Sequence, residues 1–322
     1  MPGHPPAREQ LFGHLDPVDV LRRCGRTFYA ASRVLPVDVR RDLAVLYAFC
    51  RVVDDCADLK CEEGQDTSNE SLLAEIEAGL DGSSDRSPVV RSFRELASKH
   101  NVPHEHAKEL IVGVRSDMGR VRVRTEAELI RYAYRVASTV GLMMCRILGV
   151  REAGDAFAID LGIGMQLTNI ARDVAEDASN DRVYIPSDWV DHDVLRGVAM
   201  GDPLAGNVAR VTDAVERALS LADEYYESAE LGMHYLPTRV RGGIRAAAWN
   251  YRAIAGRIRK DPVRAVRTRV HTSDVSKAAR CAGAVWQSLL ESLPLGPDDA
   301  HDDRLHIPLA SLRLAHAGQA VQ

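Results

Sequence analysis

Helical periodicity is the feature that most constrains the fold of this 322-residue chain. Apolar side chains recur three and four positions apart over long stretches, which places them on one face of an α-helix. These stretches are residues 37–59, 126–148, 153–177, 207–230, 237–260 and 274–292. No segment alternates apolar and polar residues between turn dipeptides, as a half-buried strand would. The sequence therefore predicts an all-α protein.

Segments rich in Gly, Pro, Ser and Asp separate the helical stretches and form the two ends of the chain. The internal breaks lie at residues 62–68, 81–88, 101–103 and 179–188. Residues 1–15 and 294–322 have a similar composition, and we expect them to be mobile tails. Between them we predict a single helical domain, residues 16–293, with a central cavity.

Charge and apolar content limit the partners and the compartment. A net charge of −5 and a pI near 6.1 argue against nucleic acid as the main partner. The N-terminal stretch has no apolar run of the kind found in secretory signals, and no 18-residue apolar segment predicts a membrane span. We therefore expect a cytoplasmic protein whose six cysteines stay reduced.

Two pairs of aspartates lie about 120 residues apart, and in each pair the carboxylates are spaced i, i+4. The pairs are Asp54 with Asp58 and Asp173 with Asp177. On a helix this spacing puts both carboxylates on one face, where like charges cost a few tenths of a kcal/mol. A hard divalent cation would offset that repulsion, because such ions prefer oxygen ligands. Two such helices facing each other would form a metal site.

The helical face that carries the first pair changes character along its length. From the charged end it reads Asp58, Asp54, Arg51, Tyr47 and Ala44. This order fits a cavity with a charged mouth and an apolar interior. An alternative is a solvated face on which Arg51 forms a salt bridge with Asp54 or Asp55.

The face that carries the second pair has a similar order. From its polar end it reads Asp177, Asp173, Asn169, Gln166, Gly162 and Ala158. Carboxylate and carboxamide oxygens suit Mg²⁺, and the neighbouring Arg172 could bind a phosphate beside it. The alternative is an ordinary helix with a polar end. That reading covers the aspartates, but it does not explain Gln166 and Asn169 among apolar neighbours.

Several segments resemble motifs of the squalene/phytoene synthase family over residues 24–290. LYAFCRVVDD (46–55) and QLTNIARDVAED (166–177) match its two aspartate-rich motifs. YAYRVASTVGLMM (132–144) matches an inner helix, and TFYAASRVLP (27–36) matches a flap that closes the active site. The bacterial carotenoid branch is the most similar. The chain departs from the family pattern at Val123 and Glu126, where Tyr and Phe are usual, and at Ser138, where Gly is usual.

The resemblance implies an isoprenoid synthase-type helical bundle that uses Mg²⁺ or Mn²⁺. It implies a metal set of Asp54, Asp58, Asn169, Asp173 and Asp177. It implies catalytic roles for Tyr47, Arg51, Arg172, Tyr251 and Arg269. It implies that substrate contacts Phe28, Ser32, Ala44, Tyr132, Val136, Val140, Ala158, Gly162, Gln166 and Lys277.

The activity implied by the resemblance is the head-to-head condensation of two geranylgeranyl diphosphates to phytoene, through a cyclopropyl (prephytoene) diphosphate, without NADPH. The small Ser32 and Ala44 favour this twenty-carbon donor, because short side chains lengthen a tunnel. The nearest alternative is a squalene or dehydrosqualene synthase that uses farnesyl diphosphate. A non-catalytic assembly or binding protein on the same fold is a weaker alternative. The ten Lys and Arg of residues 239–269 form either a solvated helix or a peripheral contact with anionic lipid, near downstream carotenoid enzymes.

Overall fold

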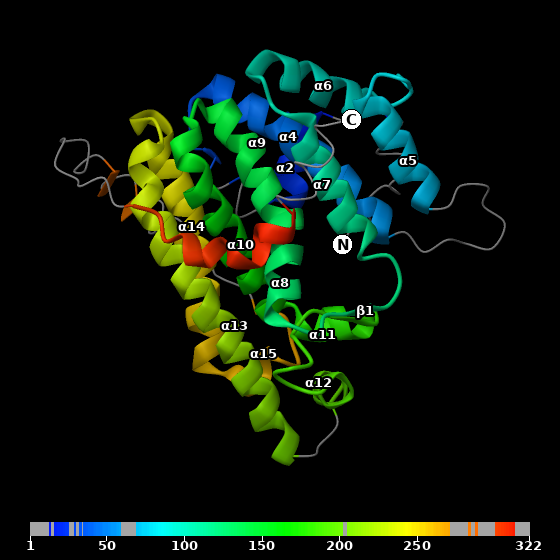
Figure 1. The fold of residues 1–322 in the computed structure, drawn as a ribbon, viewed down its shortest axis with the longest axis vertical. Coiled ribbons are helices and arrows are strands. Elements are labelled where there is room, and N and C mark those ends of the chain that lie inside the picture. The colour runs from blue at the N-terminus through cyan, green and yellow to red at the C-terminus, as the bar shows by residue number, and fades with distance from the viewer. Residues whose placement is uncertain are drawn as a thin grey trace.

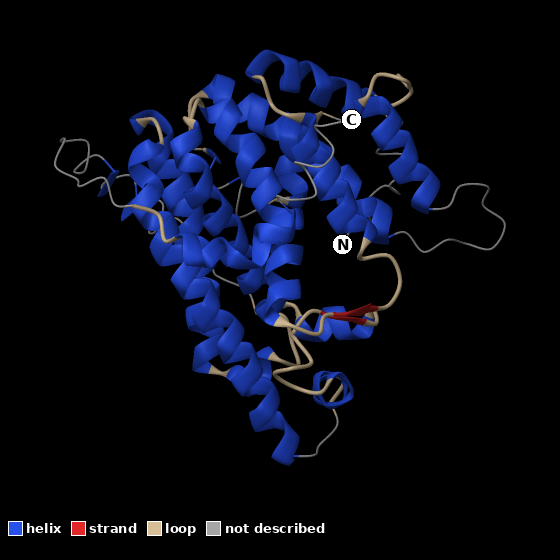
Figure 2. Cartoon of the chain, in the orientation of Figure 1, coloured by secondary structure: helices blue, strands red, loops and turns tan. Residues whose placement is uncertain are grey.

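The computed structural model describes most of the chain as a bundle of α-helices (Figures 1 and 2). The described residues are 16–25, 35–58, 69–201, 205–270 and 300–312, with positions 13, 29, 32, 33, 283, 284, 287 and 288. For residues 58, 205 and 206 only the backbone is described. The predicted all-α class is confirmed.

The helices follow one another with short connections. The N-terminal part contains α2 (Pro17–Cys24), α4 (Val37–Asp58), α5 (Asn69–Leu80), α6 (Pro88–His100) and α7 (His104–Arg115). The centre contains α8 (Glu126–Ala133), the π-helical turn η1 (Tyr134–Ser138), α9 (Thr139–Leu148), the 3-10 turn η2 (Glu152–Gly154) and α10 (Asp155–Arg172). The C-terminal part contains α11 (Val174–Ser179), α12 (His192–Ala199), α13 (Ala205–Leu231), the 3-10 turn η3 (Gly232–Tyr235), α14 (Thr238–Lys260), α15 (Pro262–Ala265) and the 3-10 helix η4 (Asp303–Leu309).

Four of the predicted helical stretches agree closely with α4, with α8 to α9, with α13 and with α14. The stretch 153–177 differs, because the helix breaks at Asp173 and continues as α11. The stretch 274–292 lies mostly outside the described residues. No strand was predicted, yet β1 (Val121–Arg122) and β2 (Arg182–Val183) form a two-residue parallel bridge (Figure 2).

Two hydrophobic cores organise the bundle. One core joins α4, α5, α6, α7 and α9, and the other joins α8, α10, α11, α12 and α13. Helix α14 crosses both, with Val240, Ile244 and Ala248 in the first core and Ile254 and Ile258 in the second. The first aspartate motif therefore belongs to one core and the second motif to the other.

Helix α10 packs very closely against the rod formed by α8, η1 and α9. A Cβ added at Gly162 would lie 2.5 Å from the backbone Cα of Ser138. The Ser138 hydroxyl is buried and donates to the carbonyl of Ile159 at 2.7 Å. Only a glycine at position 162 allows this approach, so helix packing alone explains the small residue that we had assigned to a tunnel wall.

The segment 300–312 packs onto the bundle rather than forming a free tail. In Figure 1 this red segment crosses in front of α10 and α8. His306, Leu309 and Leu312 are buried, and the two leucines join the second core. The expected mobility is therefore wrong for residues 300–312, while the domain limits at residues 16 and 293 stay predictions.

None of the helices in the described part of the chain is both long enough and apolar enough to cross a lipid bilayer.

Candidate functional site

The second aspartate motif lies at the junction of α10 and α11. Asp173 ends α10 with φ −105° and ψ 15°, so the two aspartates do not share one unbroken helix. The backbone hydrogen bonds nevertheless continue through the junction. The Asp173 N–H donates to the Asn169 carbonyl at 2.9 Å, and the Asp177 N–H donates to the Asp173 carbonyl at 2.8 Å. This one-turn spacing keeps the side chains of Asn169, Asp173 and Asp177 on neighbouring turns.

Two arginines hold the Asp173 carboxylate. Arg172 donates to it through Nε at 2.8 Å and through Nη2. Arg269, which follows α15, lies with its Nε 3.1 Å from the same carboxylate and also pairs with Glu176 at 2.8 Å. The structure thus brings together three of the predicted site residues, although Arg269 is almost one hundred positions away in sequence.

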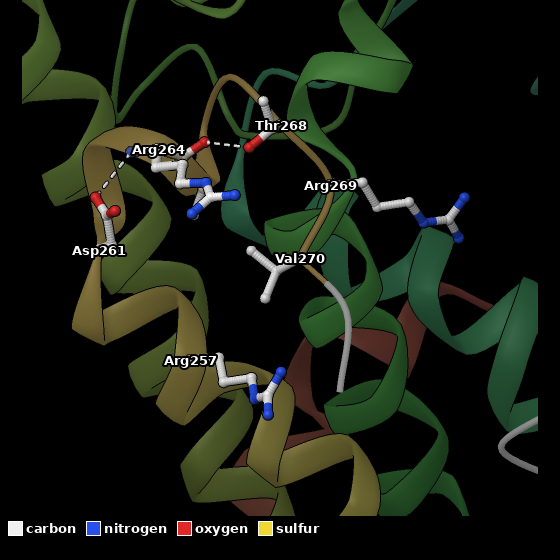
Figure 3. A pocket seen from close by; sticks show the side chains of 7 residues that line it. Arg257, Asp261, Arg264, Thr268, Arg269 and Val270 are labelled. Atoms are coloured by element: carbon white, nitrogen blue, oxygen red, sulfur yellow. Dashed lines mark hydrogen bonds between the residues drawn. The ribbon is translucent and has the colours of Figure 1, made fainter. Parts of the chain in front are cut away.

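A pocket of about 340 Å³ adjoins Arg269 (Figure 3). Its other basic residues are Arg257 of α14 and Arg264 of α15. Figure 3 shows the guanidinium group of Arg269 turned away from those of Arg257 and Arg264, toward the side on which it meets Asp173. The pocket has the positive lining that an anionic group such as a phosphate requires.

The second motif also has the properties expected of a cation site. The buried Oδ1 of Asn169 has no hydrogen-bond partner among the described residues, while its Nδ2 donates to Gln166 at 3.3 Å. Burial, with the neighbouring Asp173 and Glu176, raises the pKa of Asp177 to about 8. An acceptor without a donor and a buried carboxyl without sufficient counter-charge both suit a bound divalent cation.

The first aspartate motif is more open. Asp54 is exposed, and Arg51 forms its ion pair with Asp55 one turn further along α4. This pairing is the one that the solvated-face alternative predicted. The Nε of Arg51 is nevertheless buried and lacks a hydrogen-bond partner within the described residues. The side chain of Asp58 lies outside the described residues.

The described metal-site carboxylates do not gather in one tight cluster. Where side chains are described, those of Asp54, Asp173 and Asp177 do not form a group of three with oxygens within 4.8 Å of one another. The metal set therefore stays a prediction. It requires the two motifs to act from opposite sides of a ligand.

Arg182, a residue that the sequence analysis missed, lies between the two motifs. Its Nη2 donates to the carbonyl of Ala57, next to Asp58 in α4, at 3.2 Å. Its Nε donates to the carbonyl of Asp117 at 3.0 Å, and its charge partly opposes the rise in the pKa of Asp177. Arg182 thus links the end of α4 to the α11 side of the site. No motif marked it, because it lies in a stretch that the sequence analysis read as a break.

Tyr132 takes part in a hydrogen-bonded network. Its hydroxyl donates to Asp117 at 2.8 Å, and the hydroxyl of Tyr184 donates to the other oxygen of that carboxylate at 2.7 Å. The rings of the two tyrosines stack with centroids 4.6 Å apart. Asp117 and Tyr184 were not among the predicted site residues. The segment 116–129 had been treated only as uncertain packing, and within it Val123 is buried in the second core.

The Tyr184→Phe substitution should lower the free energy of unfolding by about 1.5–3 kcal/mol, because it removes a donor from a buried carboxylate. Tyr225→Phe is a matched control, since the Tyr225 hydroxyl is also internal but donates to a neutral acceptor, the Leu305 carbonyl, at 2.9 Å. That control should cost only about 1 kcal/mol. Urea unfolding of both variants measures the difference. Equal losses would show that Asp117 does not depend on Tyr184.

The remaining predicted residues are placed as follows. Ser32 and Ala44 are 1% and 0% exposed, so both lie in packed interior. Tyr47, Tyr251, Val140, Ala158 and Gln166 are half-buried. Val136 is half-buried, and it contacts α7, because a Cβ at Gly113 would lie 2.8 Å from its Cγ1. Phe28 and Lys277 lie outside the described residues.

Tyr47 and Tyr251 connect the two motifs electrostatically. Burial chiefly raises the pKa of Tyr47, and Cys24, Asp54 and Tyr251 add to the rise. Tyr251 in turn is among the neighbours that raise the pKa of Arg172, where they outweigh the opposing effect of burial. The ring of Tyr47 also lies against Gly25, since an added Cβ there would be 2.9 Å from it. The site thus combines α4, α10 and α14.

Comparison with known proteins follows from this geometry. Residues 21–276 match the family model described as squalene/phytoene synthase. The chain belongs to the squalene/phytoene synthase family. The matched region contains both aspartate motifs, the π-helical turn and Arg269, so the family assignment covers every element of the site described above.

Bacterial family members are similar over most of their length. The chain is 34% identical over 288 residues to a protein named 15-cis-phytoene synthase from Paracoccus sp., covering 87% of this chain and 93% of that protein. It is 35% identical over 287 residues to one named phytoene synthase from Rhodobacter capsulatus, covering 87% and 83%. A solved dehydrosqualene synthase superposes with a TM-score of 0.71 at 23% identity, covering 86% and 95%. That last likeness shows the fold alone.

Proposed function

We propose that this protein is a phytoene synthase of carotenoid biosynthesis, which condenses two geranylgeranyl diphosphates head to head. The observation that carries the proposal is the second aspartate motif, in which Arg172 and Arg269 both contact Asp173. This arrangement combines oxygen ligands for a metal with cationic donors for a diphosphate. Relatives that share more than four-fifths of this chain bear the name phytoene synthase.

We propose Mg²⁺ as the metal, with Mn²⁺ as a substitute, since the proposed ligands are all oxygen donors. Asp54 and Asp58 would hold it on one side, and Asn169, Asp173 and Asp177 on the other. The unpartnered Oδ1 of Asn169 and the raised pKa of Asp177 support this set. When bound, the ion supplies Lewis-acid stabilisation of the diphosphate leaving group.

The protein's own residues bind and orient the diphosphates. Arg51, Arg172 and Arg269 provide charge-assisted hydrogen bonds, which favour diphosphate as its negative charge grows during ionisation. In the first half-reaction the C1–O bond of one donor breaks and its diphosphate leaves. The allylic cation then attacks the double bond of the second donor, and loss of a proton closes the cyclopropyl diphosphate.

The second half-reaction breaks the C–O bond of the cyclopropyl diphosphate. Rearrangement and loss of a second proton then give phytoene, with two diphosphates released in total and no reductant consumed. The cationic species must be kept from water. Tyr47 and Tyr251 are suited to this task, because both are half-buried and aromatic faces stabilise nearby cations.

Incubation of the full-length protein with Mg²⁺ and geranylgeranyl diphosphate, without NADPH, tests the proposal directly. We expect a forty-carbon hydrocarbon and diphosphate. A thirty-carbon product formed only from farnesyl diphosphate would instead support a squalene or dehydrosqualene synthase. Absence of turnover with either donor, in protein shown to be folded by circular dichroism, would support a non-catalytic role.

The length of the donor should depend on Ser32 and Ala44. Ser32→Phe combined with Ala44→Trp should shift the donor preference toward farnesyl diphosphate by at least about tenfold, since even one methylene group in an apolar pocket changes selectivity by about 10–200-fold. A competition assay with both donors measures the ratio of products. Because both positions are buried, thermal melting must accompany the assay, and Ser32→Val with Ala44→Val provides a milder pair. An unchanged preference in folded variants would contradict the tunnel hypothesis.

We further propose that the enzyme works at the inner face of the membrane, near the enzymes that use its insoluble product. Part of the basic stretch is already engaged within the protein. Arg245 is 2% exposed and pairs with Glu230, and Arg259 pairs with Glu216 and Asp223. Exposed positions such as Arg264 and Arg267 therefore remain the better candidates for contact with anionic lipid.

A further inference from the structure

A buried cluster of two histidines and an aspartate lies away from the aspartate motifs. Asp160, on α10, is fully buried, thirteen positions before Asp173 in the same helix. His306 places its Nε2 2.8 Å from Oδ1 of Asp160, and His301 places its Nε2 3.0 Å from Oδ2. Both histidines come from the segment 300–312, which the sequence analysis had treated as a tail.

Supporting hydrogen bonds surround the cluster. The hydroxyl of Ser228 on α13 donates to Oδ2 of Asp160 at 2.5 Å. On its other ring nitrogen, His301 faces Oδ1 of Asp303 at 3.2 Å. Histidine ligands of metals commonly have such a carboxylate on the second nitrogen, which fixes the orientation of the ring. The arrangement therefore includes both direct donors and the groups that orient them.

The ring of His301 lacks enough protons for these contacts when it is neutral. A neutral imidazole has one N–H donor and one acceptor nitrogen, yet both nitrogens of His301 face carboxylate oxygens. If Nδ1 donates to Asp303, then Nε2 presents a lone pair to Asp160. A cation located between Nε2 and the carboxylate removes this conflict and also neutralises the buried charge of Asp160.

The donor set and its dimensions suit a first-row transition metal. The three ligand atoms all lie within 4.8 Å of one another. Two ligands of a tetrahedral zinc, each about 2.0–2.1 Å from the ion, are about 3.3 Å apart, so shifts of a few tenths of an ångström would create the site. Two imidazoles favour Zn²⁺ over Mg²⁺, which takes oxygen ligands.

We propose that Asp160, His301 and His306 bind a Zn²⁺-class ion that fastens the segment 300–312 to helices α10 and α13. The ion is distinct in chemistry from the one proposed for the aspartate motifs, because it has nitrogen ligands. Water completes its coordination, since the side chain of His301 keeps 9% exposure. The site has a structural role, because it joins a C-terminal segment to the centre of the bundle.

Metal binding can be measured on the full-length protein without any activity assay. Protein stripped with chelator, and kept in excess Mg²⁺, is titrated with Zn²⁺ and with Co²⁺. We expect one Zn²⁺ per chain by elemental analysis and the visible absorption of tetrahedral Co²⁺. We also expect a higher melting temperature with Zn²⁺ and slower hydrogen exchange in residues 300–312, since an ion that binds only the folded state stabilises it.

Matched variants distinguish a metal site from a hydrogen-bonded cluster. His301→Ala and His306→Ala should each remove the Co²⁺ absorption and the response of the melting temperature. His100→Ala is the control, because His100 also pairs with a carboxylate, Asp42, at 2.8 Å, and it should leave both signals intact. Wild-type protein that binds no Zn²⁺ under these conditions overturns the proposal. Retention of the Co²⁺ spectrum by both cluster variants overturns it as well.

Discussion

The Asp173→Asn variant should lose at least about a thousandfold of its turnover while keeping its helical fold. A ligated cation contributes several kcal/mol to stabilising the leaving group, and about 4 kcal/mol corresponds to a thousandfold change in rate. The substitution removes a charged metal ligand and also loosens Arg172 and Arg269, which both contact this carboxylate. Phytoene formation from geranylgeranyl diphosphate with Mg²⁺ measures the loss. Asp54→Asn should act in the same direction.

Asp223→Asn is a matched control for this experiment. Asp223 also meets two arginines, Arg252 at 3.6 Å and Arg259 at 2.9 Å, but it lies on α13 outside both motifs. This variant should keep its turnover within about a few-fold, because surface pairs contribute about 1 kcal/mol or less. If Asp173→Asn and Asp54→Asn together remained active, the metal hypothesis would be refuted. A loss in Asp223→Asn as large as that in Asp173→Asn would point to general destabilisation.

Gly162→Ala should lower the free energy of unfolding by about 3 kcal/mol, at the upper end of the usual cost of overpacking. The added methyl group would meet backbone atoms of Ser138, its Cα at 2.5 Å and its N at 2.7 Å. Backbone atoms cannot rotate aside as the end of a flexible side chain can. Helix α10 and the turn η1 would have to separate, which should also break the hydrogen bond from Ser138 to Ile159. Chemical denaturation measures the change.

Gly256→Ala provides the control on another helix. Nothing lies within 4 Å of a Cβ added at Gly256, which is exposed on α14. Alanine should therefore raise the free energy of unfolding by about 0.5–1 kcal/mol, the usual gain from removing glycine from a helix interior. Opposite signs for the two substitutions would establish close packing at Gly162. A neutral Gly162→Ala would mean that α10 has room to move there.

The long helices could be predicted because their apolar period is strong enough to outweigh local exceptions. The break at Asp173 could not, since no glycine or proline marks it. Its surroundings depend partly on Arg269, which tertiary structure brings to the site. The segment 300–312 was misjudged on composition, although Leu309 and Leu312 are core residues. Sequence spacing describes one helix at a time, whereas these features depend on contacts between distant elements.

The motif residues of the site were recognised more completely than the residues that support them. Asp54, Asn169 and Asp173 lie in patterns that point to metal chemistry, while Asp117, Arg182 and the Asp160 cluster do not. One signal was available for Asp160. It is a lone carboxylate in the apolar stretch 156–165, and a buried carboxylate requires partners. The identity of those partners could not be read from the sequence, because both histidines are about 140 residues away.

The division of the bundle into two cores gives ligand binding a mechanical consequence. A diphosphate that contacts both aspartate motifs would tie together two separately packed halves, which the protein itself links through Arg182, α14 and the rod from α8 to α9. Occupancy of the site should therefore make unfolding of the two halves more cooperative. In hydrogen exchange, amides of α4 and α10 should then gain protection together, even where they are far from the ligand.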